Sequence, residues 1–244
     1  MNETTTTGQR PEPKPAADER DALLSVAAHE IRTPLASLRL YLDAVIKAAD
    51  RGSLDAADVG VRLRKARRQC DRLNVLLNDL IDIARAPARP LAVPPEPVDI
   101  VAAVSGVCDR LREQFTSDGW NVEVIGAGPL LGVWDRTRLE QMAANLIASA
   151  HKRAPSAPVK VELKPGDGDR VALIVSDSGP GLPPEEQERV FQRPTKESLG
   201  AEGIGAVGLW LVARIADAFG GTVRMENPPA GGTKFTIDLP RGQV

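Results

Sequence analysis

Two apolar stripes with a helical repeat constrain this 244-residue chain more than any other feature. In each stripe the apolar residues recur alternately four and three positions apart, which is the seven-residue repeat of supercoiled helices. The polar segment around Gly52 separates the stripes, so an antiparallel helical hairpin is expected. The stripes consist of Leu24, Ala28, Ile31, Leu35, Leu38, Leu42 and Val45, and of Val59, Leu63, Ala66, Cys70, Leu73, Leu77, Leu80 and Ala84.

The hairpin is expected to occupy residues 20–86 and to pair with a second copy. Two helices alone form a thin core, because each buries only one stripe. We therefore predict that two hairpins associate as a four-helix bundle in a homodimer, in which Cys70 is a small core residue. Residues 1–19 are rich in threonine, proline and charge, so they are predicted to be a disordered tail.

A proline-rich linker at residues 87–98 marks the boundary to a second domain, because proline cannot continue a helix. Residues 99–244 alternate between helical and extended periods. Helices are expected at 99–115, 138–152 and 209–219, and strands at 121–125, 159–163, 171–175, 222–225 and 234–239. This order predicts an α/β sandwich, with one sheet backed by helices.

Composition excludes several classes of protein. The 31 basic and 33 acidic residues nearly balance, which argues against electrostatic capture of nucleic acid. Two cysteines and two histidines are too few for a disulfide scaffold or a Cys/His zinc cluster. The longest apolar run, residues 204–213, is about half of the roughly 20 residues that a membrane span needs. The first residues lack the features of a signal peptide, so a cytoplasmic location is expected.

One histidine stands out on the first helix. His29 lies one position past the stripe residue Ala28, so its side chain should face solvent. An ordinary surface histidine is the simplest interpretation, but Thr33 shares its face and Pro34 interrupts the helix at a cost of about 3 kcal/mol. The resulting kink could turn Glu30 toward the imidazole. A largely neutral imidazole is a competent nitrogen nucleophile near pH 7.

The run His29-Glu30-Ile31-Arg32-Thr33-Pro34-Leu35 resembles the H-box of bacterial two-component sensor histidine kinases. The resemblance implies that His29 accepts the γ-phosphoryl group of ATP, with Glu30 as its acid/base partner. It also implies that Thr33 positions water when the kinase dephosphorylates its response regulator.

Three motifs in the second domain are candidates for nucleotide binding. Residues 177–181 place Asp177 and two glycines after a buried strand, where a carboxylate can accept a hydrogen bond from an exocyclic amine. The glycines at 203, 205 and 208 precede a helix whose N-terminus favours phosphate. Asn145 and Lys152 share a helix face. Each motif also has a plain structural interpretation, as a turn, a loop or a solvated face. There is no P-loop, and the polar segment before Gly203 excludes a Rossmann fingerprint.

In this order the motifs resemble the GHKL-type ATP-binding domain of the same kinases. The resemblance implies that ATP and Mg²⁺ are cofactors, that Asp177 reads adenine and that Asn145 is the metal ligand. The nucleotide-binding residues that it implies are Asn145, Ser149, Lys152, Asp177, Gly179, Gly181, Gly205, Gly208, Leu209 and Thr233.

Three positions depart from the family pattern. Ser149 replaces the second asparagine of the N-box, which weakens the expected metal site. Arg153 stands where an aromatic residue usually lies by the base, and could stack on adenine instead. The glycine-rich loop before Leu209 is altered.

The expected function is that of a histidine kinase that autophosphorylates His29 and transfers the phosphoryl group to a response-regulator receiver domain, with phosphatase activity toward that regulator. The alternatives are a histidine phosphotransferase or pseudokinase with a degenerate nucleotide site, and a non-catalytic dimeric interaction module. Because no sensor domain precedes the hairpin, a partner sensor protein is expected to supply the input, unless the chain is a fragment.

Overall fold

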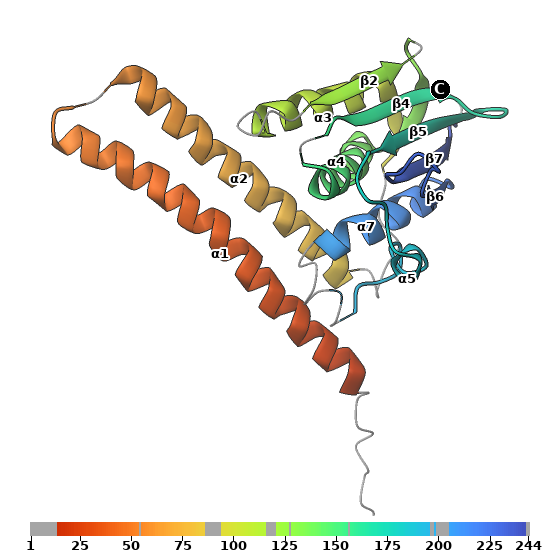
Figure 1. The fold of residues 1–244 in the computed structure, drawn as a ribbon, viewed down its shortest axis with the longest axis horizontal. Coiled ribbons are helices and arrows are strands. Elements are labelled where there is room, and N and C mark those ends of the chain that lie inside the picture. Colours follow the sequence, from red (N-terminus) through yellow and green to blue (C-terminus); the bar gives the residue numbers. More distant parts are fainter. Residues whose placement is uncertain are drawn as a thin grey trace, which may run out of the picture.

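The computed structural model describes residues 14–53, 55–85, 94–115, 121–126, 128–155, 157–195, 198 and 205–242. A long helical hairpin lies beside an α/β domain (Figure 1). Its helices are α1 (Lys14–Asp50) and α2 (Ala56–Arg85), as the two stripes predict. The predicted tail was too long, because α1 begins at Lys14 and not near residue 20. Proline is tolerated in the first turn of a helix, and the alanines that follow Pro15 favour helix. Residues 1–13 lie outside the described residues.

The turn of the hairpin is fixed by local hydrogen bonds. Gly52 has a φ of +63°, in the left-handed region that ends many helices. Its N–H donates to the carbonyl of Ala49 at 2.9 Å, and the N–H of Ser53 donates to the carbonyl of Ala48 at 3.0 Å. Asp55 caps α2, because its carboxylate accepts from the N–H of Ala57 at 3.0 Å. These caps hold α1 and α2 antiparallel.

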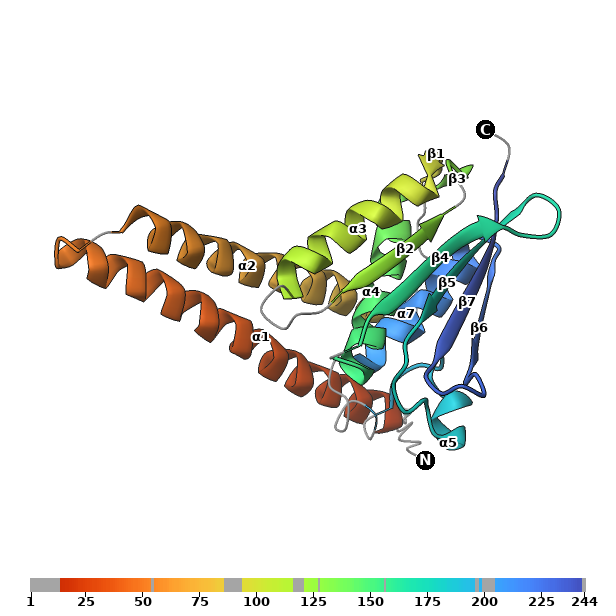
Figure 2. The same cartoon turned by 45° about the horizontal axis from the view of Figure 1, so that its top comes forward.

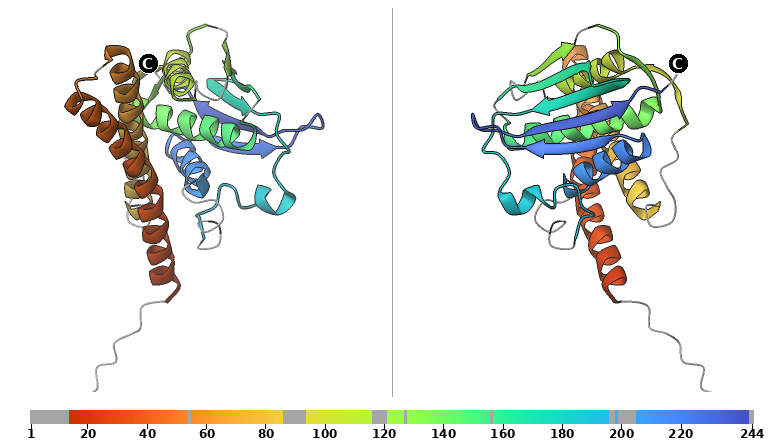
Figure 3. Two further views of the ribbon diagram at one scale, coloured as in Figure 1. Left: turned by 60° about the vertical axis from the view of Figure 1, so that its left-hand side comes forward. Right: turned by 90° about the vertical axis from the view of Figure 1, so that its right-hand side faces the viewer.

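The second domain is a mixed five-stranded sheet with helices on one face (Figures 2 and 3). The strand order is β2-β4-β5-β7-β6, and only the β2–β4 pair is parallel. The elements are α3 (Ile100–Phe115), β2 (Val122–Gly126), α4 (Arg136–Arg153), β4 (Val159–Pro165), β5 (Arg170–Ser176), α5 (Pro184–Gln187), α7 (Gly205–Ala218), β6 (Thr222–Glu226) and β7 (Lys234–Pro240). The α/β sandwich predicted from the sequence is confirmed.

A second, two-stranded sheet corrects the predicted linker. Residues 96–99 form β1 (Glu96–Asp99), which pairs antiparallel with β3 (Leu131–Trp134), so the end of the 87–98 segment belongs to the second domain. Residues 86–93 lie outside the described residues. Asp99 then caps α3, since its carboxylate accepts from the N–H of Val101 at 3.0 Å.

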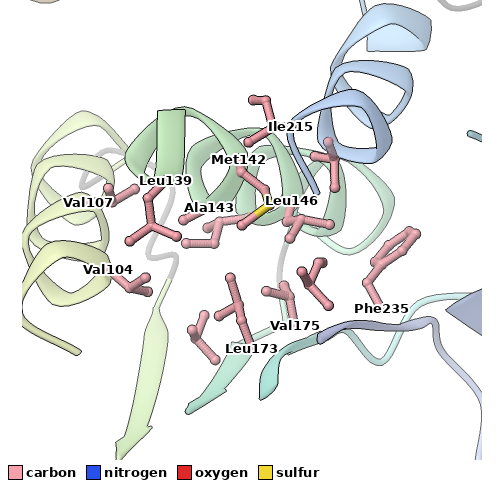
Figure 4. Close-up of a cluster of buried hydrophobic side chains, with 14 of the residues drawn as sticks. Val104, Val107, Leu139, Met142, Ala143, Leu146, Leu173, Val175, Ile215 and Phe235 are labelled. Carbon is pink, nitrogen blue, oxygen red and sulfur yellow. The ribbon is translucent and has the colours of Figure 1, made fainter. Parts of the chain in front are cut away.

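The core of the second domain lies between the sheet and helices α3, α4 and α7 (Figure 4). Leu139, Met142 and Leu146 from α4 are fully buried against Leu173 and Val175 of β5. Burial of each such side chain contributes about 1.5–3 kcal/mol. Strands β4 and β7 alternate buried and more exposed residues, whereas the five interior residues of β5 are all apolar and buried. This layer positions the loops at the strand ends.

The hairpin packs against the second domain near α7. Leu76 of α2 is buried, and Leu80 of α2 and Val26 of α1 also pack against the core cluster. Nearer the start of α2, Arg68 donates a hydrogen bond to the carbonyl of Glu113 at 3.2 Å. No helix in the described part of the chain has both the length and the apolar content to cross a membrane.

Candidate functional site

His29 is exposed on α1, as its position beside the stripe predicts. Within the described ranges its imidazole has no hydrogen bond or ion pair. Thr33, one turn later, is also exposed, whereas Glu30 is half-buried and Pro34 is buried. The helix continues through Pro34, which has no N–H to bond the carbonyl of Glu30. The imidazole is therefore accessible to a reagent from outside the hairpin, which is what a phosphoryl acceptor requires.

Asp177 follows β5 and is the most enclosed carboxylate of the candidate site. Its side chain is 0% exposed. One carboxylate oxygen, Oδ1, accepts the N–H of Gly179 at 2.9 Å and the N–H of Thr233 at 3.2 Å. The N–H of Asp177 donates in turn to the carbonyl of Thr233 at 3.0 Å. The structure thus brings together residues 56 positions apart that sequence motifs had assigned to one site.

Backbone conformation supports this arrangement at two glycines. Gly232 has a φ of +86°, and a Cβ there would lie 1.9 Å from the carbonyl oxygen of Asp177. Gly181 has a φ of +78° and lies against Asn227. Asn227 braces the loop by donating to the carbonyl of Leu182 at 2.7 Å and accepting from its N–H at 3.2 Å. Sequence reasoning missed Asn227, and its only signal was an asparagine directly after a strand.

Helix α4 carries the second group of candidates. It is capped by Asp135, whose carboxylate accepts from the N–H of Arg138 at 3.0 Å. Asn145 and Ser149 are half-buried and Lys152 is exposed. The hydroxyl oxygen of Ser149 is not free to bind a metal, because it accepts a hydrogen bond from Arg153 at 2.9 Å.

Arg153 joins this group to the Asp177 loop. Its Nε and Nη2 both donate to Oδ2 of Asp177 at 3.3 Å. Its guanidinium carbon lies 5.1 Å from the centre of the Phe235 ring. Sequence reasoning expected Arg153 beside a base but did not find that it contacts both Ser149 and Asp177.

The glycine-rich segment is placed differently from the prediction. Helix α7 begins at Gly205, so Gly205 and Gly208 lie in its first turn and do not precede it. The N–H of Gly205 is one of the four at the helix start that lack an intrahelical acceptor, whereas the N–H of Gly208, the fourth residue of α7, is not among them. The side chain of Leu209 is buried in the core, and its N–H lies beyond those four. Residues 199–204, including Gly203, are outside the described part.

Two buried polar atoms test whether these residues suit a nucleotide and its metal. The amide nitrogen of Asn145 and the hydroxyl of Thr233 have no hydrogen-bond partner among the described residues. Buried polar atoms normally have partners, so each suits a polar ligand. A Cβ at Gly208 would lie 3.5 Å from Cγ of Asn145, so α7 approaches the amide closely. As hydrogen-bond donors, the Asn145 amide nitrogen and the Thr233 hydroxyl suit ligand oxygens such as those of phosphate. The side-chain oxygen of Asn145 is the atom that could hold a metal, whereas Ser149 is engaged elsewhere.

Comparison with protein families identifies both domains. Residues 19–89 match the His Kinase A (phospho-acceptor) domain. Residues 134–243 match the histidine kinase-, DNA gyrase B- and HSP90-like ATPase. The chain belongs to the sensor histidine kinases of two-component signalling. Its two-domain order is that of the family, and the alternative of a non-kinase interaction module is thereby set aside.

Relatives of this kinase are longer than the chain. It is 32% identical over 219 residues to the signal transduction histidine-protein kinase/phosphatase MprB of Mycolicibacterium smegmatis, covering 88% of this chain and 44% of the relative. The MprB of Mycobacterium leprae is 32% identical over 234 residues, with 91% and 44% covered. The chain thus spans less than half the length of these relatives.

Solved structures agree with the fold. Full-length ShkA in complex with AMPPNP matches with a TM-score of 0.61 and 25% identity, over 92% of this chain and 46% of ShkA. The mycobacterial sensor histidine kinase MprB matches with a TM-score of 0.50 and 27% identity, over 61% of this chain and 99% of that structure.

Two further titratable side chains lie on the helices. His151 of α4 is buried at 9% exposure. Cys70 of α2 is exposed on the single chain, and it lies seven residues from Leu63 and from Leu77, which are also exposed. The expectation that Cys70 is a core residue concerns the homodimer, so it stays a prediction.

Proposed function

We propose that this chain uses ATP to phosphorylate its own His29 and then passes the phosphoryl group to an aspartate of a response-regulator receiver domain. The single observation that carries the proposal is the exposed, unpartnered imidazole of His29 within the described residues, on a chain that also holds the Asp177 loop. In the reaction an imidazole nitrogen bonds to the γ-phosphorus as the bond to the departing ADP oxygen breaks. Glu30 takes the imidazole proton.

Nucleotide binding would use the Asp177 loop for the base and helices α4 and α7 for the phosphates. Asp177 would accept the exocyclic amine of adenine. Gly179 and Gly181 would allow close approach of the base. Mg²⁺, when bound, would neutralise phosphate charge. In this proposal Asn145 holds the metal, Ser149 contributes weakly, and Lys152, Gly205 and Gly208 lie by the phosphates. Thr233 lies by the base, because its N–H bonds to Asp177, and Leu209 contributes only through the packing of α7, because its side chain is buried in the core.

The exposed halves of the two stripes support a homodimer. Leu24, Leu35, Leu42, Leu63 and Leu77 are 41–61% exposed on the single chain. An apolar strip of this length on a hairpin suits a second copy, because paired hairpins form a four-helix bundle. A mass of one chain by light scattering at micromolar concentration would contradict this.

Dephosphorylation of the regulator is a second proposed activity. The relatives are named as kinase/phosphatase proteins. Thr33 is exposed one turn from His29 and could orient a water molecule. Thr33→Ala should retain autophosphorylation and lose the phosphatase reaction, whereas equal loss of both would contradict this role. Because ATP and receiver domains are cytoplasmic, the proposal places the chain there.

A pseudokinase or phosphotransferase remains the second candidate, and a specific observation favours it. Arg153 donates hydrogen bonds to both Ser149 Oγ and Asp177 Oδ2. Two oxygen atoms that would contact the nucleotide or its metal are therefore already bonded within the chain. In that case His29 would receive its phosphoryl group from another protein.

One experiment separates the two candidates. The chain is incubated with γ-labelled ATP and Mg²⁺, beside His29→Ala and Asp177→Asn. The kinase predicts acid-labile label that both substitutions abolish. Absence of label together with absence of ATP binding would support the phosphotransferase, and label retained by His29→Ala would refute the assigned acceptor.

A further inference from the structure

The carboxylate of Asp177 has no acceptor position left for a base. A carboxylate offers about four lone-pair sites, two on each oxygen. Oδ1 accepts the N–H groups of Gly179 and Thr233, and Oδ2 accepts Nε and Nη2 of Arg153. The side chain is also fully enclosed, so water cannot exchange for these donors easily. An incoming amine must therefore displace one of the donors.

Arg153 is the donor that can leave. The N–H groups of Gly179 and Thr233 are part of the backbone that shapes the loop, and Thr233 also accepts from the N–H of Asp177. The guanidinium, in contrast, is at the end of a long side chain that is 15% exposed. Its departure would open Oδ2 without moving the loop.

Ser149 keeps Arg153 in place while the site is closed. Its hydroxyl accepts from Nη1 at 2.9 Å, one helical turn before Arg153. The Phe235 ring lies under the guanidinium carbon at 5.1 Å. Ser149 is thus bonded to the guanidinium that covers Asp177. The two residues of α4 that depart from the family pattern, Ser149 and Arg153, are therefore hydrogen-bonded to each other.

We propose that Arg153 is a latch on the base-reading carboxylate, which competes with the exocyclic amine of adenine for Oδ2 of Asp177. This rests on the proposed function, in which Asp177 reads adenine. Ser149 is a positioning residue for the latch. The apparent association constant for the nucleotide then equals the intrinsic association constant multiplied by the fraction of chains in which the latch is open.

The latch acts on the base and not on the phosphates. Asn145, Gly205 and Gly208 lie on α4 and α7, and none of them bonds to the guanidinium in the described structure. Losing the latch should therefore strengthen binding of ligands that carry adenine and leave a bare phosphate chain unaffected. Since the amine of the base takes the place of the guanidinium at the same oxygen, the change in affinity should be on the order of tenfold, which is about 1.4 kcal/mol.

The test is calorimetric titration of the whole chain with ADP and with tripolyphosphate, without divalent cation. Arg153→Gln should lower the Kd for ADP by on the order of tenfold, and Ser149→Ala should lower it by less. Arg136→Gln is the matched control, because Arg136 is on the same helix in an exposed ion pair with Glu96 at 3.5 Å. Neither the control nor the tripolyphosphate titrations should change.

The outcomes distinguish the latch from the function on which it rests. A higher Kd for ADP in Arg153→Gln would show that Arg153 is a ligand of the base and overturn the latch. Equal tightening of ADP and tripolyphosphate would also overturn it. If Arg153→Gln does not fold by its melting curve, Arg153→Lys, which keeps the charge but loses the planar fork, should show a smaller tightening. Absence of ADP binding in every chain would overturn the proposed function itself.

Discussion

Two adjacent glycines allow the Asp177–Thr233 contact to be tested with a matched pair of substitutions. Gly231 and Gly232 have φ values of +92° and +86°, so alanine is strained at both. Only Gly232 lacks space, since its added Cβ would lie 1.9 Å from the Asp177 carbonyl oxygen and 2.8 Å from its carbonyl carbon. At Gly231 the nearest atom would be 3.9 Å away. Gly231→Ala therefore measures the conformational strain alone.

The expected magnitudes follow from the contacts. Left-handed backbone costs an alanine about 1–2 kcal/mol, which both variants lose. Gly232→Ala must also separate Thr233 from Asp177, which breaks the N–H to carbonyl bond of 3.0 Å and the N–H to Oδ1 bond of 3.2 Å. A neutral bond contributes about 1 kcal/mol and a charged one about 1.5–3 kcal/mol. Gly232→Ala should thus be less stable than Gly231→Ala by about 3 kcal/mol.

Urea denaturation followed by tryptophan fluorescence measures this difference. All three tryptophans lie at positions 120, 134 and 210, so the signal reports the second domain and not the hairpin. Gly232→Ala should also lose ADP binding while Gly231→Ala retains it. Equal destabilisation by the two variants, or intact ADP binding in Gly232→Ala, would refute the role assigned to the Asp177–Thr233 contact.

Three further outcomes are expected. Ser149→Asn should raise the rate of Mg²⁺-dependent autophosphorylation several-fold, because an amide oxygen replaces a hydroxyl that is bonded to Arg153; an unchanged rate in a labelling time course would contradict the weakened metal site. Cys70 should react with a thiol reagent faster when the chain is diluted below its dimer concentration, since it is exposed on the single chain beside the apolar strip; a rate independent of concentration would contradict pairing through this face. Burial raises the pKa of the Cys108 thiol from 9.0 to about 11, so it lends stability that is complete below pH 9 and is lost as pH rises toward 11. This difference in pKa corresponds to roughly 3 kcal/mol, and Cys108→Ala should flatten the loss of unfolding free energy over that range; equal slopes in both chains would contradict it.

Periodicity and short motifs predicted most of the fold. The two stripes gave the hairpin because a repeat sustained over many turns leaves few alternatives to a helix, and β5 was recognised from its continuous apolar run. The β1–β3 pair was missed because both strands give a weak sequence signal. β3 has only four residues, one of which is Gly132, and β1 lies in a proline-rich segment. Gly132 is needed because Trp134 folds over it, which only the tertiary structure reveals.

The candidate site was predicted as residue types and not as contacts. The exposure of His29 was predicted, but the residue that this turn of α1 buries is Ala27 and not the stripe residue Ala28. The Asp177–Arg153 pair could not be predicted, because it joins residues 24 positions apart through the packing of α4 against the end of β5. A substitution away from a family pattern shows that something changed, but the partner that Arg153 acquires depends on long-range geometry.

The chemical linkage of the phosphoryl group tests the central claim most directly. After incubation with ATP and Mg²⁺, the chain is digested at neutral pH and its peptides are analysed by mass spectrometry, with ³¹P NMR of the intact protein. We expect one phosphoryl group on the peptide that contains His29, bonded to imidazole nitrogen, lost in acid and retained in base. Phosphate on a hydroxyl or carboxylate of that peptide, for example an acid-stable ester on Thr33, would contradict the assignment of His29 as the acceptor.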